Sequence, residues 1–372
     1  MRVLLLSMIF LCALAVRAPD LWPPRFWAED ASTFLSDQLR FGWQAFFFPY
    51  AGYLHAVPRL SMMLIDLFPL SWAASLSMII VVAMTAWSAS IIIRVCGAGA
   101  GGAIAAIALV LASGWTEPVG SVTNLQWVIA PGLLALILKT SAIGRAEGLV
   151  FAFLASLSGP FAAAFAPLTA IVVTTQFYRY RSINWVAIIA GISGLVQVLV
   201  IVLSPESTGS QKAEPVWLFA RLLALPFGYS PLPLVAALLL VATLFVGESR
   251  WLRAGLVSGV LLLTAIVCVK FNHLPRIFEA GTVGQRYWYV QGVLWVMVAA
   301  SALSDVSKIG KALAVGGLLL TFLQVNKEPL RREWPWPTQS WSGFVSEAQM
   351  SPATHHYAPG WNFDLDLSGS KK

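Results

Sequence analysis

The sequence predicts an all-α polytopic membrane protein, and three observations lead to this prediction. Hydrophobic residues make up 58% of the 372 residues and charged residues only 11%, whereas a soluble domain of this length carries about 25% charged residues. Apolar runs close to 20 residues recur along most of the chain, and each is long enough to cross a hydrocarbon core of about 30 Å. The runs are continuous and do not alternate with polar residues, which is typical of spanning helices.

The chain begins with a short apolar run, Val3–Val16, which we interpret as a first helix that remains part of the protein. A cleaved signal peptide is the alternative, because Ala13 and Ala15 form a small-residue pattern. A polar first loop, 18–69, follows this run. Further spans are expected at Leu70–Ile93, Ala100–Ala112, Asn124–Leu138, Trp185–Leu203, Pro231–Val246, Ala254–Val269, Trp288–Leu303 and Ala312–Leu323.

Basic residues in short loops predict the orientation, since such loops stay on the cytoplasmic side. Arg145 and Arg179 flank a longer apolar segment, Gly148–Phe177, and both look cytoplasmic. The segment must therefore cross twice or enter and return, and its "SGP" break at 158–160 agrees, because proline stops a helix. The other loops placed on this side carry Lys139, Arg181, Arg250, Arg253, Lys308 and Lys311.

This reading gives roughly nine to eleven transmembrane helices, nine if the 148–177 segment is re-entrant. Residues 1–325 then form one transmembrane module, and residues 326–372 form a short extracytoplasmic tail. The first loop, 18–69, lies on the same outer face as the tail, and the N-terminus lies inside.

The net charge of +7 fits basic cytoplasmic loops and anionic membrane lipid, and no nucleic-acid-binding motif accompanies it. Cys12, Cys96 and Cys268 have the spacing of neither a metal site nor a disulfide framework. The "GAGAGGA" stretch at 97–103 lacks the Lys-Ser/Thr of a phosphate loop. Its small residues predict tight helix packing instead.

An acidic pair in the first loop, Glu29 and Asp30, is the strongest candidate for chemistry in so apolar a chain. A carboxylate near the membrane surface can act as general base on a hydroxyl. Adjacent side chains point in different directions, so one acid is expected to react and the other to orient it or bind a cation. The alternative is a solvated loop or the first turn of a helix, where acids are favourable.

Three further outer segments carry polar and aromatic groups. In "YLHAVPRL", Tyr53, His55 and Arg59 are candidates to hold sugar or phosphate. The alternative for Arg59 is an arginine that snorkels from an interfacial anchor helix. The turn "TNLQW" supplies two amides and an indole, a combination suited to a sugar ring. The alternative is that Asn124 caps a helix and Trp127 is an interfacial tryptophan. The residues concerned are Asn124, Gln126 and Trp127.

The outer loop before Trp288 is unusual because it is basic on the translocated side. It contains His273 and Arg276, and "RYWY" places Arg286 and Tyr287 at the start of the next span. A phosphate group is a suitable partner for these cations. The alternative is that short outer loops tolerate some arginine and that Glu279 pairs with one of them.

Together these residues resemble the GT-C superfamily of polytopic glycosyltransferases, and its bacterial branch that modifies cell-envelope polysaccharide or lipid. The resemblance rests on "FWAED" after the first span, on "TNLQW", on "RYWY" and on the ending "YAPGWNFDLDL". It covers the architecture of most of the chain but few individual residues.

The resemblance implies an inverting transfer of sugar from polyprenyl phosphate to a glycan or lipid acceptor, at the outer face of a bacterial cytoplasmic membrane. Asp30 or Glu29 would be the general base, with Asp30 preferred. Arg286, with Arg59, would hold the leaving phosphate. A divalent cation, Mg or Mn, is the one cofactor that the resemblance leaves open, and the sequence shows no dedicated ligands for it.

Two other functions compete with this one. A flippase or transporter of lipid-linked sugar needs ionisable residues within the spans, and the sequence has very few. A membrane acyltransferase needs a histidine-centred site, for which His273 is a candidate.

Overall fold

The computed structural model describes residues 2–18, 22–27, 29–112, 118–204, 232–270, 286–305, 307–325, 340–358 and 361–365. The described chain is mostly helical, as the sequence predicts. Its longer helices are α1 (Arg2–Arg17), α3 (Ala56–Ile65), α4 (Ala73–Cys96), α5 (Ala100–Leu111), α6 (Leu125–Leu138), α7 (Arg145–Ser156), α9 (Ala166–Tyr180), α10 (Trp185–Leu203), α12 (Leu232–Ala242), α13 (Arg250–Lys270), α14 (Arg286–Leu303) and α15 (Lys308–Val325). The shorter elements are η2 (Asp30–Leu35), α2 (Ser36–Phe41), η3 (Gly42–Phe47), η4 (Leu70–Trp72), η5 (Thr140–Ala142), α8 (Phe161–Ala164), η7 (Thr243–Phe245), α16 (Trp341–Ala348), β1 (Ala353–Ala358) and β2 (Trp361–Leu365).

Three helices among the described residues are long and apolar enough to cross a membrane: Leu70–Cys96, Trp185–Leu203 and Arg250–Val267. The outer side of α10 exposes large apolar side chains, among them Val202 and Leu203, as expected of a lipid-facing surface. Other apolar runs form shorter helices, such as α5 with 12 residues, about 18 Å long at 1.5 Å per residue. The number of crossings, nine to eleven, remains a prediction.

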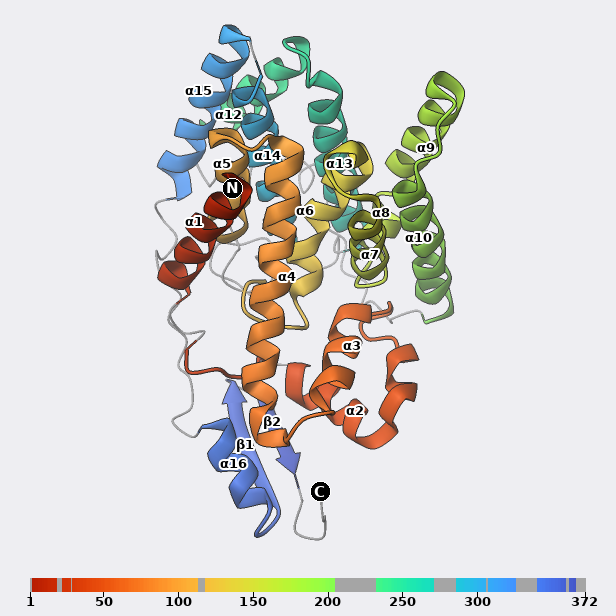
Figure 1. Cartoon of the computed structure of the whole chain (residues 1–372), viewed down its shortest axis with the longest axis vertical. Helices are drawn as coiled ribbons and strands as arrows, with labels where there is room; N and C mark the ends of the chain where they lie inside the picture. Colours follow the sequence, from red (N-terminus) through yellow and green to blue (C-terminus); the bar gives the residue numbers. More distant parts are fainter. Residues whose placement is uncertain are drawn as a thin grey trace.

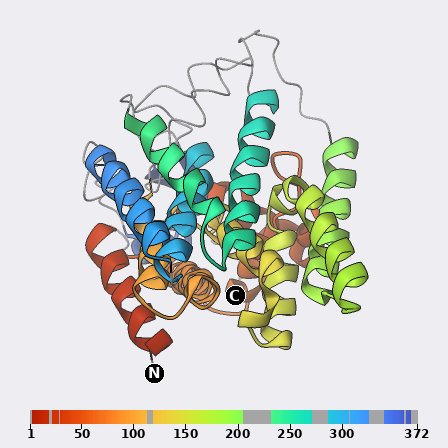
Figure 2. The same cartoon turned by 90° about the horizontal axis from the view of Figure 1, so that it is seen from above.

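The helices lie side by side in a bundle, with α1 and α15 on one flank and α9 and α10 on the other (Figures 1 and 2). Within it α4 packs against α1, α5 and α6, while α14 packs against α5, α13 and α15. Gly101 brings α5 against α14 so closely that a Cβ atom there would lie 2.3 Å from the carbonyl oxygen of Ala300. The prediction that the small residues of 97–103 serve helix packing is confirmed.

Helix ends that carry basic residues gather at one end of the bundle. Lys139 Nζ donates to the carbonyl oxygen of Val95 over 3.0 Å, and Arg94 forms an ion pair with Glu147. Nearby, the buried guanidinium of Arg253 pairs with Asp305 at the end of α14, at 3.2 Å. The basic loops therefore lie together, as the orientation argument requires.

The segment from α7 to α9 turns back on itself. At its two ends, Arg145 and Arg181 line one groove, and the Arg145 guanidinium carbon lies 5.9 Å from the Trp185 ring centroid. At its break, the hydroxyl of Ser158 accepts a hydrogen bond of 2.7 Å from the backbone N–H of Val57 in the first loop. The segment thus leaves the basic end, reaches the first loop and returns, as expected from its proline break.

The first loop and the tail pack together at the opposite end of the bundle (Figure 1). The indole N–H of Trp341 donates to the carbonyl oxygen of Leu70 over 2.8 Å, and its ring meets Phe26 edge-on at 4.6 Å. The tail departs from the all-α expectation, because β1 and β2 form an antiparallel hairpin. Strands form here because buried and exposed side chains alternate, for example at Phe363, Asp364 and Leu365. A two-residue alternation is the period of a strand.

These two ends of the bundle give a test of the predicted orientation. In a variant without the native cysteines, we expect Ser182→Cys at the basic end to react with an impermeant maleimide only in inverted vesicles. Ser342→Cys, in the tail, should react only in intact cells. Both positions are exposed, so the sidedness of labelling reports the membrane side alone. Labelling of both cysteines from the same side would contradict the orientation.

Candidate functional site

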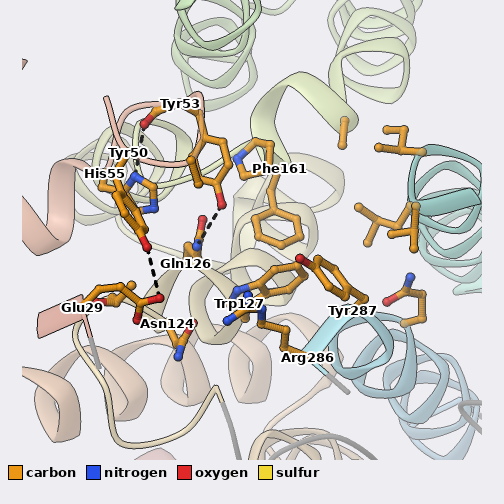
Figure 3. A pocket seen from close by; sticks show the side chains of 18 residues that line it. Glu29, Tyr50, Tyr53, His55, Asn124, Gln126, Trp127, Phe161, Arg286 and Tyr287 are labelled. Atoms are coloured by element: carbon orange, nitrogen blue, oxygen red, sulfur yellow. Dashed lines mark hydrogen bonds between the residues drawn. The ribbon is translucent and has the colours of Figure 1, made fainter. Parts of the chain in front are cut away.

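A cavity of about 290 Å³ lies where the first loop meets the bundle (Figure 3). Four parts of the chain line it: the first loop, the start of α6, the break around α8, and the facing stretches of α13 and α14. Eight of the twelve residues singled out from the sequence line it: Glu29, Tyr53, His55, Asn124, Gln126, Trp127, Arg286 and Tyr287. These eight residues therefore lie around one cavity, as expected from the sequence.

Glu29 presents its carboxylate to this cavity. The Tyr50 hydroxyl donates a hydrogen bond of 3.1 Å to Glu29 Oε1, as Figure 3 shows. Burial and the negative charge of Glu29 raise the pKa of Tyr50 well above its usual value, while the charge of Arg286 opposes this shift. Tyr50 therefore stays a phenol and fixes one oxygen of Glu29.

Asp30 lies beside Glu29 but does not line the cavity. It begins the π-helical turn η2, and its side chain is 1% exposed. Its carboxylate accepts backbone N–H bonds from Thr123 at 2.8 Å, Val122 at 3.2 Å and Trp27 at 3.3 Å, and hydroxyl bonds from Thr123 at 2.6 Å and Ser121 at 3.2 Å. Asp30 thus ties the first loop to the turn before α6.

Burial raises the pKa of Asp30 to about 6, and its hydrogen bonds, led by that of Thr123, oppose the shift. The carboxylate is engaged on both oxygens, whereas the carboxylate of Glu29 faces open volume. The two acids therefore have different surroundings, as the sequence predicts for adjacent side chains. The sequence-based preference for Asp30 as the general base is not supported by its buried position outside the cavity.

His55 forms part of the cavity wall as a neutral ring. Its Nδ1 lies 3.1 Å from the carbonyl oxygen of Tyr53, so Nδ1 carries the proton and Nε2 is a bare acceptor. Burial is the main cause that lowers its pKa to about 3. Nε2 is buried without a hydrogen-bond partner, and the ring stacks on Tyr53 at 4.6 Å. A neutral acceptor suits a hydroxyl and not a phosphate.

The "TNLQW" turn supplies the amides and the indole. Asn124 stands at the N-cap position of α6, but its side chain forms no capping bond, so the capping explanation of this residue is excluded. Gln126 Nε2 lies 3.4 Å from the Tyr53 hydroxyl, and its Oε1 is buried without a partner. Gly159, with φ +133°, leaves room for this amide, because a Cβ atom there would lie 2.2 Å from Oε1.

Aromatic rings close the side of the cavity next to α14. Trp127 meets Phe161 edge-on at 5.0 Å and Tyr287 edge-on at 5.3 Å. Arg286 also faces the cavity, with its guanidinium carbon 5.5 Å from the Tyr287 ring centroid. The Glu29 carboxylate and the Arg286 guanidinium thus line one cavity, together with the rings of Trp127 and Tyr287 (Figure 3).

Arg59 is not part of this cavity. Its side chain is 2% exposed, pairs with Asp37 at 2.7 Å, donates to the carbonyl oxygen of Phe48 at 3.2 Å and lies over the Phe34 ring. The contacts of Arg59 therefore lie inside the first loop, and its burial does not fit an arginine that snorkels to the membrane surface. His273 and Arg276 lie outside the described residues.

The lining residues that were not singled out from the sequence include Tyr50, Phe161 and Gln291. Gln291 lies one helical turn after Tyr287, so their common face of α14 could have been anticipated. Its Oε1 is buried without a hydrogen-bond partner. Tyr50 and Phe161 carried no such signal, because contacts between distant segments place them.

Comparison of the chain with known protein families, curated proteins and solved structures finds no match. Among the described residues, no three His, Cys, Asp or Glu side chains are grouped as a metal site. Glu29 faces Tyr50 and Asp30 faces Thr123, so these two acids do not form one donor set for a divalent cation.

Proposed function

We propose that this protein is a membrane glycosyltransferase that moves a sugar from a polyprenyl-phosphate donor to a glycan or lipid acceptor, at the outer face of a bacterial cytoplasmic membrane. The observation that carries the proposal is the two-part lining of the cavity. Glu29, Arg286 and the amides form a polar part, while the α13 side is apolar, with Leu263, Ile266 and Val267. An amphiphilic donor matches such a lining, with its sugar phosphate at the polar part and its chain leaving along α13.

In the proposed reaction Glu29 is the general base, since its carboxylate faces the cavity. It takes the proton of the acceptor hydroxyl as that oxygen forms a bond to the anomeric carbon. The bond from the anomeric carbon to the phosphate oxygen breaks on the opposite side, and polyprenyl phosphate leaves with the electron pair. Arg286 stabilises the negative charge on this phosphate.

Neutral groups would bind the sugar. Nε2 of His55 and Oε1 of Gln126 are buried acceptors without a partner, and sugar hydroxyls supply donors for them. The indole of Trp127 offers an apolar face next to these acceptors. Asn124, Tyr53 and Tyr287 line the same space.

A flippase or transporter of lipid-linked sugar is the second candidate, and Gln291 favours it. This buried amide of α14 lines the cavity together with residues of α13, and its Oε1 has no partner. A polar group inside a helix bundle is often part of a path for substrates. The two candidates differ in whether the sugar leaves the lipid.

The test uses the full chain in vesicles with polyprenyl phosphate that carries a radiolabelled sugar, together with an envelope extract as acceptor. We expect the label to move from lipid to acceptor, whereas a transporter would leave it on the lipid. Arg286→Gln should raise the donor KM about tenfold, because a hydrogen bond between charged groups is lost. Arg40→Gln is the control for charge, since Arg40 is exposed on the same side of the protein. An unchanged donor KM for Arg286→Gln would remove Arg286 from the site.

A further inference from the structure

A second groove, of about 500 Å³, lies at the basic end of the bundle, where the α7–α9 segment begins and ends. It lies between the turn before α7 and the turn before α10, and α7 and α10 pack against each other. Its charged lining residues are Arg145 and Arg181, and both are exposed. Neither forms an ion pair within the described part of the chain, so both charges remain available to a ligand.

The groove also contains a buried donor without a partner. Asn184 is 5% exposed, and its Oδ1 caps α10 by accepting from the backbone N–H of Ala187 at 3.0 Å. Its Nδ2 is buried and makes no hydrogen bond. A buried N–H group without an acceptor is costly, so an acceptor atom bound in the groove would stabilise this amide.

Two helix N-termini point at the same groove. α7 has 12 residues and follows Gly144, and α10 has 19 residues and follows Asn184. Helix N-termini favour anions through their free N–H groups and the helix dipole. The nearest acid on α7, Glu147, is engaged by Arg94 and by the indole N–H of Trp87, and it does not line the groove.

We propose that this groove binds a phosphate group, carried by an anionic membrane lipid. The guanidinium groups of Arg145 and Arg181 and the Nδ2 of Asn184 are donors, and the Thr140 hydroxyl in the same lining can donate too. Such a set of donors matches the acceptor oxygens of a phosphate. The rim exposes Ile183 and Trp185, and the apolar outer side of α10 continues from there. An anionic lipid matches both the donor-lined groove and the apolar side of α10, since its headgroup fills the groove and its chains lie along the helix. A soluble phosphate matches the groove alone.

Asn184→Asp tests this proposal without removing the helix cap, because an aspartate oxygen accepts from Ala187 as the amide oxygen does. The change replaces the unpartnered donor by a charged acceptor. We expect native mass spectrometry of the full chain in detergent to show retained dioleoylphosphatidic acid, with affinity about tenfold lower in Asn184→Asp and in Arg145→Gln. Arg179→Gln is the matched control, because Arg179 lies against Tyr180 and does not line the groove.

Wild-type binding of phosphatidic acid in Asn184→Asp would overturn the proposal, provided that thermal unfolding without lipid shows the variant to be folded. An equal loss in Arg145→Gln and Arg179→Gln would also overturn it, since it would reveal attraction to surface charge alone. Inorganic phosphate is titrated in parallel. Binding of inorganic phosphate with the same dependence on Asn184, and no retained lipid, would confirm the phosphate chemistry and reject the lipid as its source.

Discussion

Glu29→Gln is expected to abolish sugar transfer while leaving the stability of the protein unchanged. The glutamine keeps the size of the side chain, and its amide oxygen still accepts the hydrogen bond from Tyr50. It cannot take a proton from the acceptor hydroxyl. A positioned general base contributes about 10²- to 10⁴-fold to a rate, so kcat should fall by about this factor. The measurement is single-turnover release of labelled sugar from the lipid donor, with the melting temperature recorded on the same samples.

Tyr50→Phe is the matched control for Glu29→Gln. It removes the donor that holds Oε1 and leaves the carboxylate in place, so we expect a smaller loss of kcat, about tenfold, consistent with one lost hydrogen bond. Full activity in Glu29→Gln would reject Glu29 as the base and, with it, the proposed mechanism. Label that crosses the membrane without leaving the lipid, in both variants, would favour the flippase.

The sequence predicted the parts of the site that local chemistry controls. Three features can be recognised in the sequence itself: an acidic pair next to aromatics, an amide-rich turn and an arginine at a helix start. Their residues Glu29, Gln126 and Arg286 do line one cavity. Basic residues at helix ends predicted that Arg145 and Arg181 lie on one side of the protein, and both line the groove between α7 and α10. The proline break at 158–160 predicted the return of that segment.

The parts that the sequence missed depend on contacts between distant segments. Nothing local shows that Arg59 meets Asp37, because an arginine on an amphipathic helix looks the same whether it is paired or exposed. The roles of Glu29 and Asp30 could not be separated either, since the donors that engage Asp30 come from the turn at 121–123, more than 90 residues away. The tail was predicted without strands, as part of an all-α protein, although its alternating residues form a hairpin.

Asp30→Asn is expected to impair both stability and activity, in contrast to Glu29→Gln. Both oxygens of Asp30 accept hydrogen bonds, and the oxygen facing Trp27 and Val122 accepts from two backbone N–H groups. An asparagine must place its NH2 group against donors on one side or the other. Leaving buried donors unsatisfied costs about 1–3 kcal/mol each, so the melting temperature should fall by several degrees. Transfer should then fail because the first loop is no longer held against α6.

The pH dependence of the melting temperature gives a second test of the structural role of Asp30. The pKa of Asp30 is raised from 3.8 to about 6 by burial, so the folded protein binds this proton more tightly than the unfolded chain does. By linkage, the stability contributed by this proton is present below about pH 4 and is lost as the pH rises through 6. The melting temperature of the wild type minus that of Asp30→Asn should therefore be larger at pH 5 than at pH 7.5. An Asp30→Asn variant that is inactive but melts as the wild type does would instead make Asp30 the chemical group, and would reverse the roles of the two acids.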